Sequence, residues 1–301
     1  MPDHRKFLGG VHPREGKVTA TVPIQNAPLF EKYTVPLQQH IGAPASVLVG
    51  KKDTVLRGQL IAEAAGFVSA GIHAPTSGTV TGIEEIPGPA GGAMTAVEIT
   101  SDGEDRATDP MTPIPDWETA DPELLKKRVA EAGIVGMGGA AFPTHVKLSP
   151  PPAKPIDVLI LNGVECEPCL TADHRLMLEH ADRIIRGARI IARILGAQEI
   201  TIGIERNKPD AIDLLTPMAR EAGITVRGLR VRYPQGAEKQ LIYAVSGRKV
   251  PTGGLPMDVG CVVQNVATAA AVADAVVDGK PLYERITTLT GTPRVKSGNW
   301  R

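Results

Sequence analysis

The residues best suited to chemistry lie between Gly133 and Leu148, in the stretch GIVGMGGAAFPTHVKL. Its candidate groups are Gly136, Gly138, Gly139, Phe142, His145 and Lys147. Glycine permits positive φ and lets a ligand approach without a Cβ in the way, and successive backbone N–H groups in such a turn form a nest for phosphate. The aromatic ring and two cations add partners for a planar, charged molecule. The stretch predicts a pocket for a phosphorylated ring compound, such as a nucleotide or flavin; the alternative is an ordinary glycine-rich turn.

Two well-known phosphate-binding loops are excluded here. The dinucleotide fingerprint needs GxGxxG after a strand and before a helix. Ala141 occupies the position of the third glycine, and a predicted helix precedes the stretch. No Gly-Lys-Ser/Thr follows, which excludes a Walker loop. A ligand bound here uses a different glycine loop.

Further polar groups follow two predicted strands and open a predicted helix. They occur in NGVECEP after residues 156–161, in YPQGAEKQ around residue 233, and in VVQNVAT at residues 262–268, which opens a helix to about residue 277. The side chains that can bind sugar hydroxyls or ring edges are Asn162, Glu165, Glu167, Glu238, Gln264, Asn265 and Thr268. Ligands of parallel sheets bind at the carboxyl ends of the strands. We expect these residues to join the glycine-rich stretch as walls of one pocket; the alternative is that they are turn and cap residues.

The cysteines offer a competing chemistry. Cys166 and Cys169 form a CxxC pair, which is compatible with redox chemistry or half a zinc site. A zinc site needs two further ligands, and Cys261 and scattered histidines are all that remain. No cysteine cluster is spaced for iron–sulfur ligation. We therefore expect no metal in this chain.

The elements around these residues alternate between strands and helices. Asp121 and Pro122 begin a predicted helix that Gly133 closes. Continuous apolar runs predict buried strands at residues 156–161 and 199–204, and a third strand is expected at 228–233. Helices are predicted between them, at 171–195 and at 209–222. This order predicts an α/β domain of Rossmann-like type with a parallel sheet and right-handed crossovers.

A different pattern precedes this domain. Residues 1–45 are rich in Pro and Gly and are predicted to form an extended arm, with β-like pieces such as residues 17–23. Short apolar strands separated by turns follow to about Gly103 and resemble the biotinyl/lipoyl barrel-sandwich hybrid. The hairpin tip at residues 64–70 has no lysine, so we expect a structural or docking module, with His73 part of its packing. The Pro-rich, acidic residues 104–120 are typical of a linker.

The composition excludes several classes of function. Lys+Arg and Asp+Glu both number 33 and aromatic residues make up 3% of the 301 residues, which argues against a nucleic-acid binder. The first ten residues lack the apolar core of a signal peptide. No apolar run approaches the roughly 18 residues that a membrane span requires. We expect a cytoplasmic protein.

The combination of GMGGAAFPTHVKL, NGVECEP, YPQGAEKQ and VVQNVAT resembles the C subunit of the Rnf electron-transport complex. It is similar, more distantly, to the flavin subunit of respiratory complex I. GGVHP, QHIGAP and FVSAGIHAPTSG extend the resemblance over nearly the whole chain. The resemblance implies a non-covalent FMN that takes hydride from NADH, with one-electron transfer to iron–sulfur clusters or ferredoxin. It also implies partner subunits of a membrane complex and a peripheral position on the cytoplasmic face of the inner membrane.

The resemblance also assigns roles to residues. It implies that Gly136, Gly138, Gly139 and Phe142 hold the nucleotide and flavin phosphates and that Lys147 lies close to the flavin. Asn162, Glu165 and Glu167 match residues beside FMN and the nicotinamide, and Glu165 and Lys147 are the expected catalytic residues. Glu238 matches a contact to ribose. Gln264, Asn265 and Thr268 match the segment around the ribityl phosphate.

The sequence departs from complex I at several of these positions. Met137 replaces an arginine, Val164 an aspartate and Ala237 one of two paired glutamates, which bears on nucleotide affinity more than on flavin binding. Cys169 stands where the Rnf pattern usually has an aromatic residue. The RnfC proteins continue into a β-grasp-like domain and a module with two [4Fe–4S] clusters. Residues 286–301, ending GTPRVKSGNWR, resemble the start of that β domain, so we expect a truncated chain without the clusters.

These inferences give four predicted regions: residues 1–105 as arm and barrel-sandwich hybrid, 106–120 as linker, 121–285 as FMN/NADH domain, and 286–301 as the start of the β-grasp-like domain. Two rival functions remain. One is a flavin-dependent cobalamin reductase of the same superfamily, with another electron acceptor. The other is a flavin-free scaffold that docks partners.

Overall fold

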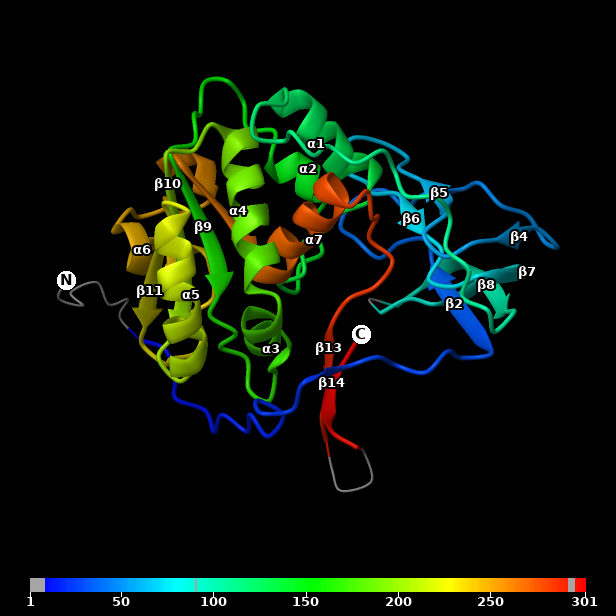
Figure 1. The fold of residues 1–301 in the computed structure, drawn as a ribbon, viewed down its shortest axis with the longest axis horizontal. Helices are drawn as coiled ribbons and strands as arrows, with labels where there is room; N and C mark the ends of the chain where they lie inside the picture. Colours follow the sequence, from blue (N-terminus) through cyan, green and yellow to red (C-terminus); the bar gives the residue numbers. More distant parts are fainter. Residues whose placement is uncertain (1–8, 90, 292–295) are drawn as a thin grey trace. The chain divides into compact units, whose positions relative to one another are not determined.

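The computed structural model describes residues 9–89, 91–291 and 296–301, and its ribbon is drawn in Figure 1. The chain forms two compact units. The β unit consists of Ala27–Lys147 and Asp274–Arg285. The α/β unit consists of the described parts of Met1–Asn26, Leu148–Ala273 and Ile286–Arg301. These units divide the chain differently from the predicted order of regions, because the first helix and the glycine-rich stretch group with the β-strands.

The β unit contains seven strands and two helices among its described residues. These are β2 (Lys32–Pro36), β3 (Ser46–Val47), β4 (Thr54–Val55), β5 (Leu60–Glu63), β6 (Ile72–His73), β7 (Gly78–Pro87), β8 (Ala93–Ser101), α1 (Pro122–Glu131) and α2 (Thr144–Lys147). The strands form two antiparallel sheets, β2-β8-β7-β4 and β3-β5-β6. The predicted all-β, barrel-sandwich-like region is confirmed.

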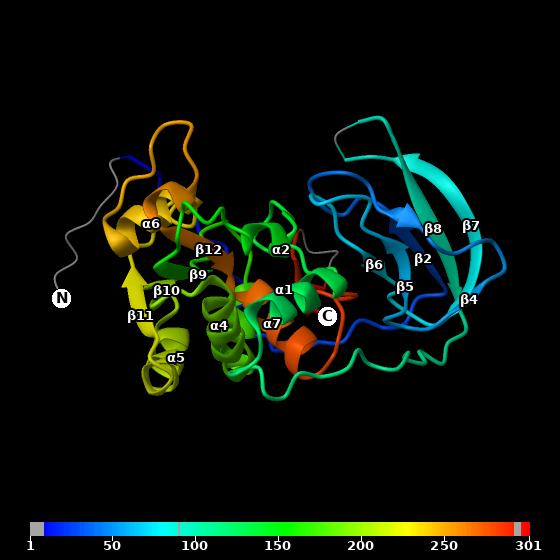
Figure 2. The ribbon, with the colours of Figure 1, turned by 90° about the horizontal axis from the view of Figure 1, so that it is seen from above.

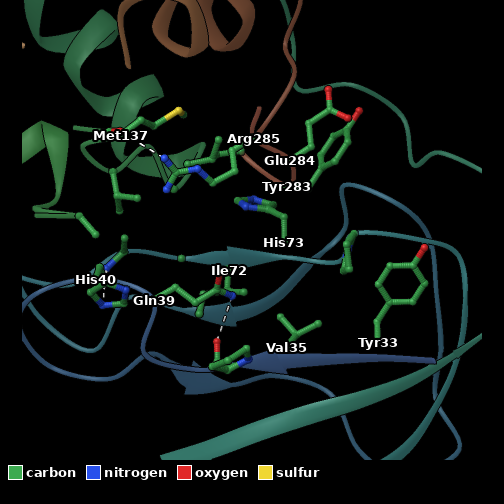
Figure 3. A pocket seen from close by; sticks show the side chains of 18 of the residues that line it. Tyr33, Val35, Gln39, His40, Ile72, His73, Met137, Tyr283, Glu284 and Arg285 are labelled. Carbon is green, nitrogen blue, oxygen red and sulfur yellow. Dashed lines mark hydrogen bonds between the residues drawn. The ribbon is translucent and has the colours of Figure 1, made fainter. Parts of the chain in front are cut away.

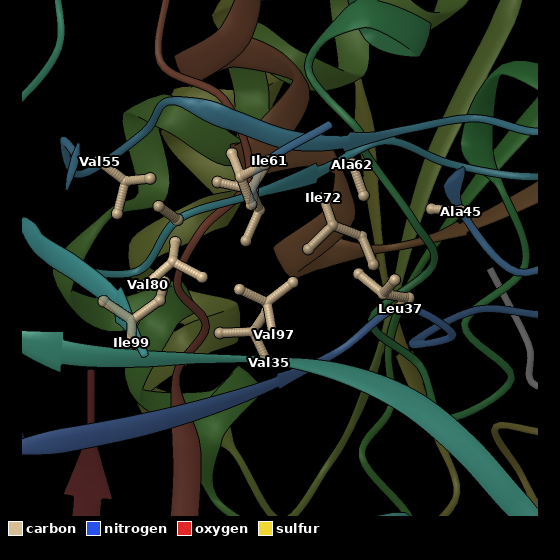
Figure 4. Close-up of a cluster of buried hydrophobic side chains, with 12 residues drawn as sticks. Val35, Leu37, Ala45, Val55, Ile61, Ala62, Ile72, Val80, Val97 and Ile99 are labelled. Atoms are coloured by element: carbon tan, nitrogen blue, oxygen red, sulfur yellow. The ribbon is translucent and has the colours of Figure 1, made fainter. Parts of the chain in front are cut away.

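The core of the β unit lies between these strands (Figure 4). Strand β7 begins with strict alternation of buried and exposed residues, as expected for a strand with one face on a core. Val80 and Val97, which are fully buried, come from β7 and β8, and Ile61 and Ile72 meet them from the other sheet. Burial of such side chains stabilises the fold by about 1.5–3 kcal/mol each.

The α/β unit contains the remaining elements. These are β1 (Ile24–Gln25), β9 (Val158–Gly163), α3 (Ala172–Glu179), α4 (Ala181–Leu195), β10 (Glu199–Glu205), α5 (Pro209–Glu221), β11 (Thr225–Leu229), α6 (Glu238–Ser246), the 3₁₀ helix η1 (Pro256–Val259), β12 (Cys261–Asn265), β13 (Thr287–Leu289) and β14 (Gly298–Trp300), together with α7 (Val266–Val277), which runs from this unit into the segment assigned to the β unit.

Its main sheet is parallel, in the order β11-β10-β9-β12. Strand β9 is buried on both faces, as its continuous apolar run predicts. Val158 and Ile160 of β9 pack against Leu241 and Ile242 of α6. Helices α4 and α5 lie on the opposite face of the sheet from α6 (Figure 2). The predicted Rossmann-like α/β architecture is confirmed.

A second, small sheet joins the two ends of the described chain. Strand β14 pairs in parallel with β1 from the arm and antiparallel with β13. The arm therefore contributes a strand to a sheet made mainly by the C-terminal residues. Residues 292–295 of the predicted β-grasp-like start and residues 1–8 of the arm lie outside the described residues.

Four local predictions were wrong. The helix predicted at 171–195 is two helices, because His180 has φ −138° and ψ 40° and ends α3 before α4 begins. The third strand is β11 at Thr225–Leu229 and not 228–233, because its partner β10 ends at Glu205. Residues 17–23 form turns instead of a strand. Of residues 262–268, expected to open a helix, 262–265 belong to β12 (Cys261–Asn265), and the helix begins only at Val266.

No helix in the described part of the chain combines the length and the apolar character needed to cross a bilayer.

Candidate functional site

The glycine loop, residues 134–143, is a tight turn in the β unit. Asp121 caps helix α1 through its Oδ1, which accepts from the Glu123 N–H at 3.0 Å, and Gly133 ends the helix region with φ +64°. The loop then doubles back: the Gly136 N–H donates to the Phe142 carbonyl at 2.9 Å. The turn is thus closed by a backbone hydrogen bond that spans its glycines.

The tip of the loop is exposed and free of side-chain bulk. Gly138, Gly139 and Ala140 are exposed, and Gly139 has φ +111°, with no atom within 4 Å of the place where a Cβ would stand. Ala141 also has positive φ, at 48°. Consecutive residues in turn conformation next to open space give backbone N–H groups that can face an anion. This geometry fits a phosphate group.

The other candidates of the stretch are Phe142, near the end of the loop, and His145 and Lys147 in helix α2. Phe142 is half-buried, and Thr144 begins helix α2 with its N–H on the Ile134 carbonyl at 2.9 Å. Lys147, the last residue of α2, is half-buried. The His145 Nε2 lies 2.9 Å from the Phe67 carbonyl oxygen, and burial lowers the pKa of His145. His145 therefore belongs to the contact between α2 and the hairpin tip.

A cavity of about 290 Å³ lies within the β unit beside the glycine loop (Figure 3). Val135, Met137 and Ala141 of the loop line it, and the Met137 carbonyl accepts from Arg285 at 3.2 Å. His73, 6% exposed, also lines it, and its Nδ1 has no hydrogen-bond partner among the described residues. Burial lowers the pKa of His73 to about 4, so its imidazole is neutral at pH 7.

The candidates of the α/β unit gather at the carboxyl edge of its sheet. Asn162 on β9 and Asn265 on β12 are register partners at the ends of adjacent strands. Strand β9 has its chain neighbours β10 and β11 on one side and β12 on the other, so these two residues mark the point where the strand order reverses. Ligands of open α/β sheets bind outside such a switch point. The predicted clustering of Asn162 and Asn265 is therefore present.

Some side chains on β12 and α7 are hydrogen-bonded within the protein, and one has a donor without a partner among the described residues. The Asn265 Oδ1 accepts from the Ala267 N–H at 2.8 Å and so caps α7, while its Nδ2 donates to Asp173 Oδ2 at 2.6 Å. Thr268 is fully buried in the first turn of α7. Gln264 is 2% exposed, and its Nε2 lacks a partner among the described residues. A buried amide donor without a partner is costly, which fits a polar ligand group at this edge.

Glu165 serves the fold as well as the candidate site. Its carboxylate accepts from the backbone N–H groups of Asp173 at 2.8 Å and His174 at 3.3 Å, at the start of α3. An anion is stabilised there by the helix dipole. Its backbone has φ +46°, a conformation that non-glycine residues rarely adopt. The carboxylate predicted to act on a cofactor is thus already bound to a helix N-terminus.

Glu167 and Glu238 occupy different settings. Glu167 is exposed, and its charge together with a hydrogen bond raises the pKa of Tyr233. Glu238 is the first residue of α6 and is half-buried. Asn162 connects the two loops, because its Nδ2 donates to the Gly236 carbonyl at 2.9 Å. Glu167 and Glu238 therefore follow strands β9 and β11 at the same edge of one sheet.

Sequence reasoning missed an ion pair at this edge. Glu205 ends β10 and Lys208 precedes α5; both are 1% exposed, and Lys208 Nζ lies 3.8 Å from Glu205 Oε2. Burial raises the pKa of Glu205 and lowers the pKa of Lys208. The signal was available, since ERNKP directly follows the second predicted strand. The carboxyl-edge rule, extended to this strand, places both residues at the same edge of the sheet.

The CxxC pair is held in the loop after β9. Cys166 accepts from the Gly236 N–H through its sulfur at 3.4 Å, and burial raises the pKa of its thiol. Cys169 has φ +68°, and its N–H donates to the Glu15 carbonyl at 2.8 Å. Cys166, Cys169 and Cys261 all carry free thiols. A raised pKa makes a thiol less reactive, so Cys166 is not set up as a nucleophile.

Comparison with known proteins places these features in a family. Residues 5–104 match the model of the RnfC barrel sandwich hybrid domain, and residues 129–274 match that of the Nuo51 FMN-binding domain. The chain is 50% identical over 288 residues to the C subunit of the proton-translocating ferredoxin:NAD(+) oxidoreductase complex of Clostridium ljungdahlii. The match covers 95% of this chain and 63% of that relative. The chain belongs to the RnfC family.

Other RnfC proteins agree with this assignment. The C subunit of the Na(+)-translocating ferredoxin:NAD(+) oxidoreductase complex of Acetobacterium woodii is 46% identical over 290 residues, which are 96% of this chain and 66% of that protein. The C subunit of the ion-translocating oxidoreductase complex of Pseudomonas aeruginosa is 48% identical over 288 residues, 95% of this chain and 37% of that protein. The chain spans about two thirds, or less, of the length of these curated relatives.

The family match includes every predicted site residue, since all lie between Gly136 and Thr268. As a member of the RnfC family, the chain carries, in residues 129–274, a segment that matches an FMN-binding domain. The exposed glycine tip and the unpartnered amide of Gln264 are groups that FMN can use. The residues present therefore fit the cofactor.

Proposed function

We propose that this chain is the NADH-oxidising flavin domain of an ion-translocating electron-transport complex. The observation that carries the proposal is the carboxyl edge of the parallel sheet, where Asn162 and Asn265 meet at the switch point and Gln264 keeps a buried amide donor without a partner among the described residues. These residues lie in the segment that matches an FMN-binding domain. When bound, FMN supplies the ability to accept two electrons and release them singly.

The protein's share is binding and orientation. The N–H groups near Gly138 and Gly139 bind phosphate, with Phe142 and Lys147 beside them. Gln264 donates its amide to a polar group of the cofactor, and Thr268 supports that contact from the start of α7. No side chain has to move a proton for electron transfer between a nicotinamide and a flavin, which agrees with the lack of an acid–base pair in the proposed machinery.

The acidic residues contribute charge and shape. Glu165, fixed on α3 by two backbone N–H groups, stands at a defined position and is the residue we assign to the nicotinamide side of the site. Glu167, which is exposed, and Glu238, which is half-buried, bind hydroxyl groups of the nucleotide. Lys147 supplies positive charge close to the flavin. These roles make Glu165 and Lys147 the proposed catalytic residues.

The names of the relatives support the proposed partners. Proteins named as ferredoxin:NAD(+) oxidoreductase subunits work within ion-translocating complexes, so we propose partner subunits, NADH and a ferredoxin-like or iron–sulfur acceptor. The chain then works at the cytoplasmic face of the inner membrane, held there by its partners.

The first experiment is an absorbance spectrum of the chain mixed with FMN and desalted, before and after anaerobic addition of NADH. We expect retained flavin absorbance that bleaches with NADH. A Gln264→Leu variant should bind FMN about tenfold more weakly, because it loses the proposed hydrogen bond from Nε2 to the cofactor. Among the described residues Nε2 has no protein partner, so the substitution breaks no hydrogen bond of this donor within the protein. Lys154→Ala, which removes an ion pair with Asp258 elsewhere in the α/β unit, is the matched control.

The outcomes separate the rival functions. Retained flavin that NADH does not bleach contradicts NADH as the donor and favours another reductant, as in a cobalamin reductase. Absence of retained flavin at every FMN concentration favours a docking scaffold. Equal affinity of wild type and Gln264→Leu contradicts the placement of the cofactor at the carboxyl edge. Glu165→Gln tests the nicotinamide side through the KM for NADH.

A further inference from the structure

Two lysine side chains hold the backbone of the segment after β9, here called the β9 loop (residues 164–170). The Nζ of the buried Lys208 donates to the Val164 carbonyl at 2.7 Å. The Lys17 Nζ, from the N-terminal arm, donates to three further carbonyls, at 2.7, 3.0 and 2.7 Å: those of Glu165, Glu167 and Leu170. An ammonium has three N–H donors, and Lys17 uses all of them on this one loop.

The arm also binds the loop through its backbone. The Cys169 N–H donates to the Glu15 carbonyl at 2.8 Å. The arm is in turn fixed by Thr19, whose hydroxyl lies 2.5 Å from that of Thr171, and by Asn299, whose amide donates to the Thr19 carbonyl at 3.2 Å. Residues 15–19 are therefore a strap across the β9 loop and not a loose extension.

The loop needs such a strap because its backbone is strained. Glu165 has φ +46° and Cys169 has φ +68°, and neither is glycine. Strained conformations of this kind persist only where contacts with the surrounding structure hold them, and they occur most often at functional sites. Each strained residue is bound directly by the arm, Glu165 through Lys17 and Cys169 through Glu15. The left-handed backbone at Glu165 helps direct its carboxylate onto the start of α3.

We propose that Lys17 is a positioning residue of the flavin site: its ammonium holds the β9 loop in the strained conformation that places Glu165 and Glu167. This inference rests on the proposed function for its flavin part. It adds that a residue of the N-terminal arm, 148 positions before Glu165, determines the geometry of the cofactor edge. Lys208, which is buried, binds the loop at Val164, and Lys17, which is half-exposed, binds it at three further carbonyls.

The first test uses the loop's own thiols and needs no flavin. In the full chain, the rate of iodoacetamide labelling at Cys166 and Cys169 is measured by peptide mass spectrometry, with the buried Cys261 as internal reference. We expect Lys17→Ala to raise the rates at both loop cysteines and leave Cys261 unchanged. Lys154→Ala removes the same charge and should leave all three rates as in wild type.

The second test uses the cofactor. Lys17→Ala should raise the Kd for FMN by about tenfold, because hydrogen bonds from a charged donor are lost. Propylammonium replaces the missing atoms and should restore both FMN affinity and slow labelling. Tetramethylammonium at the same concentration has no N–H donor and should restore neither. Rescue of this kind distinguishes positioning by the ammonium from general loss of stability.

Each result decides a separate point. Unchanged labelling of Cys166 and Cys169 in Lys17→Ala overturns the inference whatever the flavin data show. Faster labelling with unchanged FMN affinity overturns the link between the strap and the cofactor. Rescue by tetramethylammonium as well as propylammonium shows a charge effect and contradicts the hydrogen-bonded geometry. A wild-type chain that binds no FMN overturns the proposed function, and the labelling rates then still decide whether Lys17 holds the loop.

Discussion

The amide of Asn162 donates to the carbonyl oxygen of Gly236 across 2.9 Å, and this bond ties the end of β9 to the loop before α6. The oxygen of the same amide accepts from the Val164 N–H at 3.1 Å, so the side chain is bound at both ends. Two segments that carry predicted ligands, NGVECEP and YPQGAEKQ, are joined by this side chain, next to the hydrogen bond from the Gly236 N–H to the Cys166 sulfur.

We predict that Asn162→Ala weakens both stability and cofactor binding. Loss of the two bonds should lower the free energy of unfolding by about 1–2 kcal/mol. The FMN Kd should rise, because the loops after β9 and β11 lose their common support. Urea denaturation and a flavin fluorescence titration measure the two effects. Asn162→Asp keeps the acceptor for Val164 and removes the donor, so an effect on affinity as large as that of alanine assigns the loss to the Gly236 bond.

We predict that Lys208→Met is strongly destabilising. It leaves the Glu205 carboxylate, 1% exposed, without its cationic neighbour, and an uncompensated buried charge costs about 3–5 kcal/mol. The double variant Lys208→Met, Glu205→Leu should recover much of this loss, because the pair is replaced by apolar groups. A double-mutant cycle by chemical denaturation is the measurement. Strictly additive losses would rule out coupling between the two side chains.

We predict that Gly187→Ala disrupts the contact between α4 and α7. A Cβ at Gly187 would overlap the carbonyl group of Ala269, one residue after Thr268. Overpacking of this kind costs about 1–3 kcal/mol and should also displace the start of α7. Thermal unfolding and FMN affinity report the change. Gly228→Ala on β11 is the control, since its Cβ meets neighbours at ordinary distances of 3.5 Å and more, and a similar loss in both variants would contradict the prediction.

We predict that the β unit loses stability between pH 6.5 and 4 through His73. Burial lowers the pKa of His73 from 6.5 to about 4. The unfolded chain therefore binds the proton first as the pH falls, and the stabilisation present above pH 6.5 declines until about pH 4. The full effect is about 3 kcal/mol. The free energy of unfolding as a function of pH is the measurement, and His73→Phe should flatten that pH dependence; an equal slope in the variant would argue against His73 as its source.

The local sequence predicted most of the α/β architecture for physical reasons that lie within each segment. The apolar run that ends at Leu161 indicates a strand buried on both faces, and Asp121, Pro122 and Gly133 mark the ends of a helix. The carboxyl-edge rule then located Asn162 before any register was known, whereas Asn265 was expected at the opening of a helix and ends β12 in the structure. The helix break at His180 was not predictable, because the apolar spacing continues across it.

What only the tertiary structure decided involves residues far apart in the chain. No local pattern indicates that Lys17 binds carbonyls 148 or more positions later, or that β1 pairs with β14. The sequence predicted that Glu165 contacts the cofactor. Only the structure shows that its carboxylate also accepts a hydrogen bond at the start of α3 and that its backbone has positive φ. The sequence determined which groups are available at the edge of the sheet, since periodicity and turn chemistry are local. Their orientation depends on packing and hydrogen bonds across the chain, which no single segment encodes.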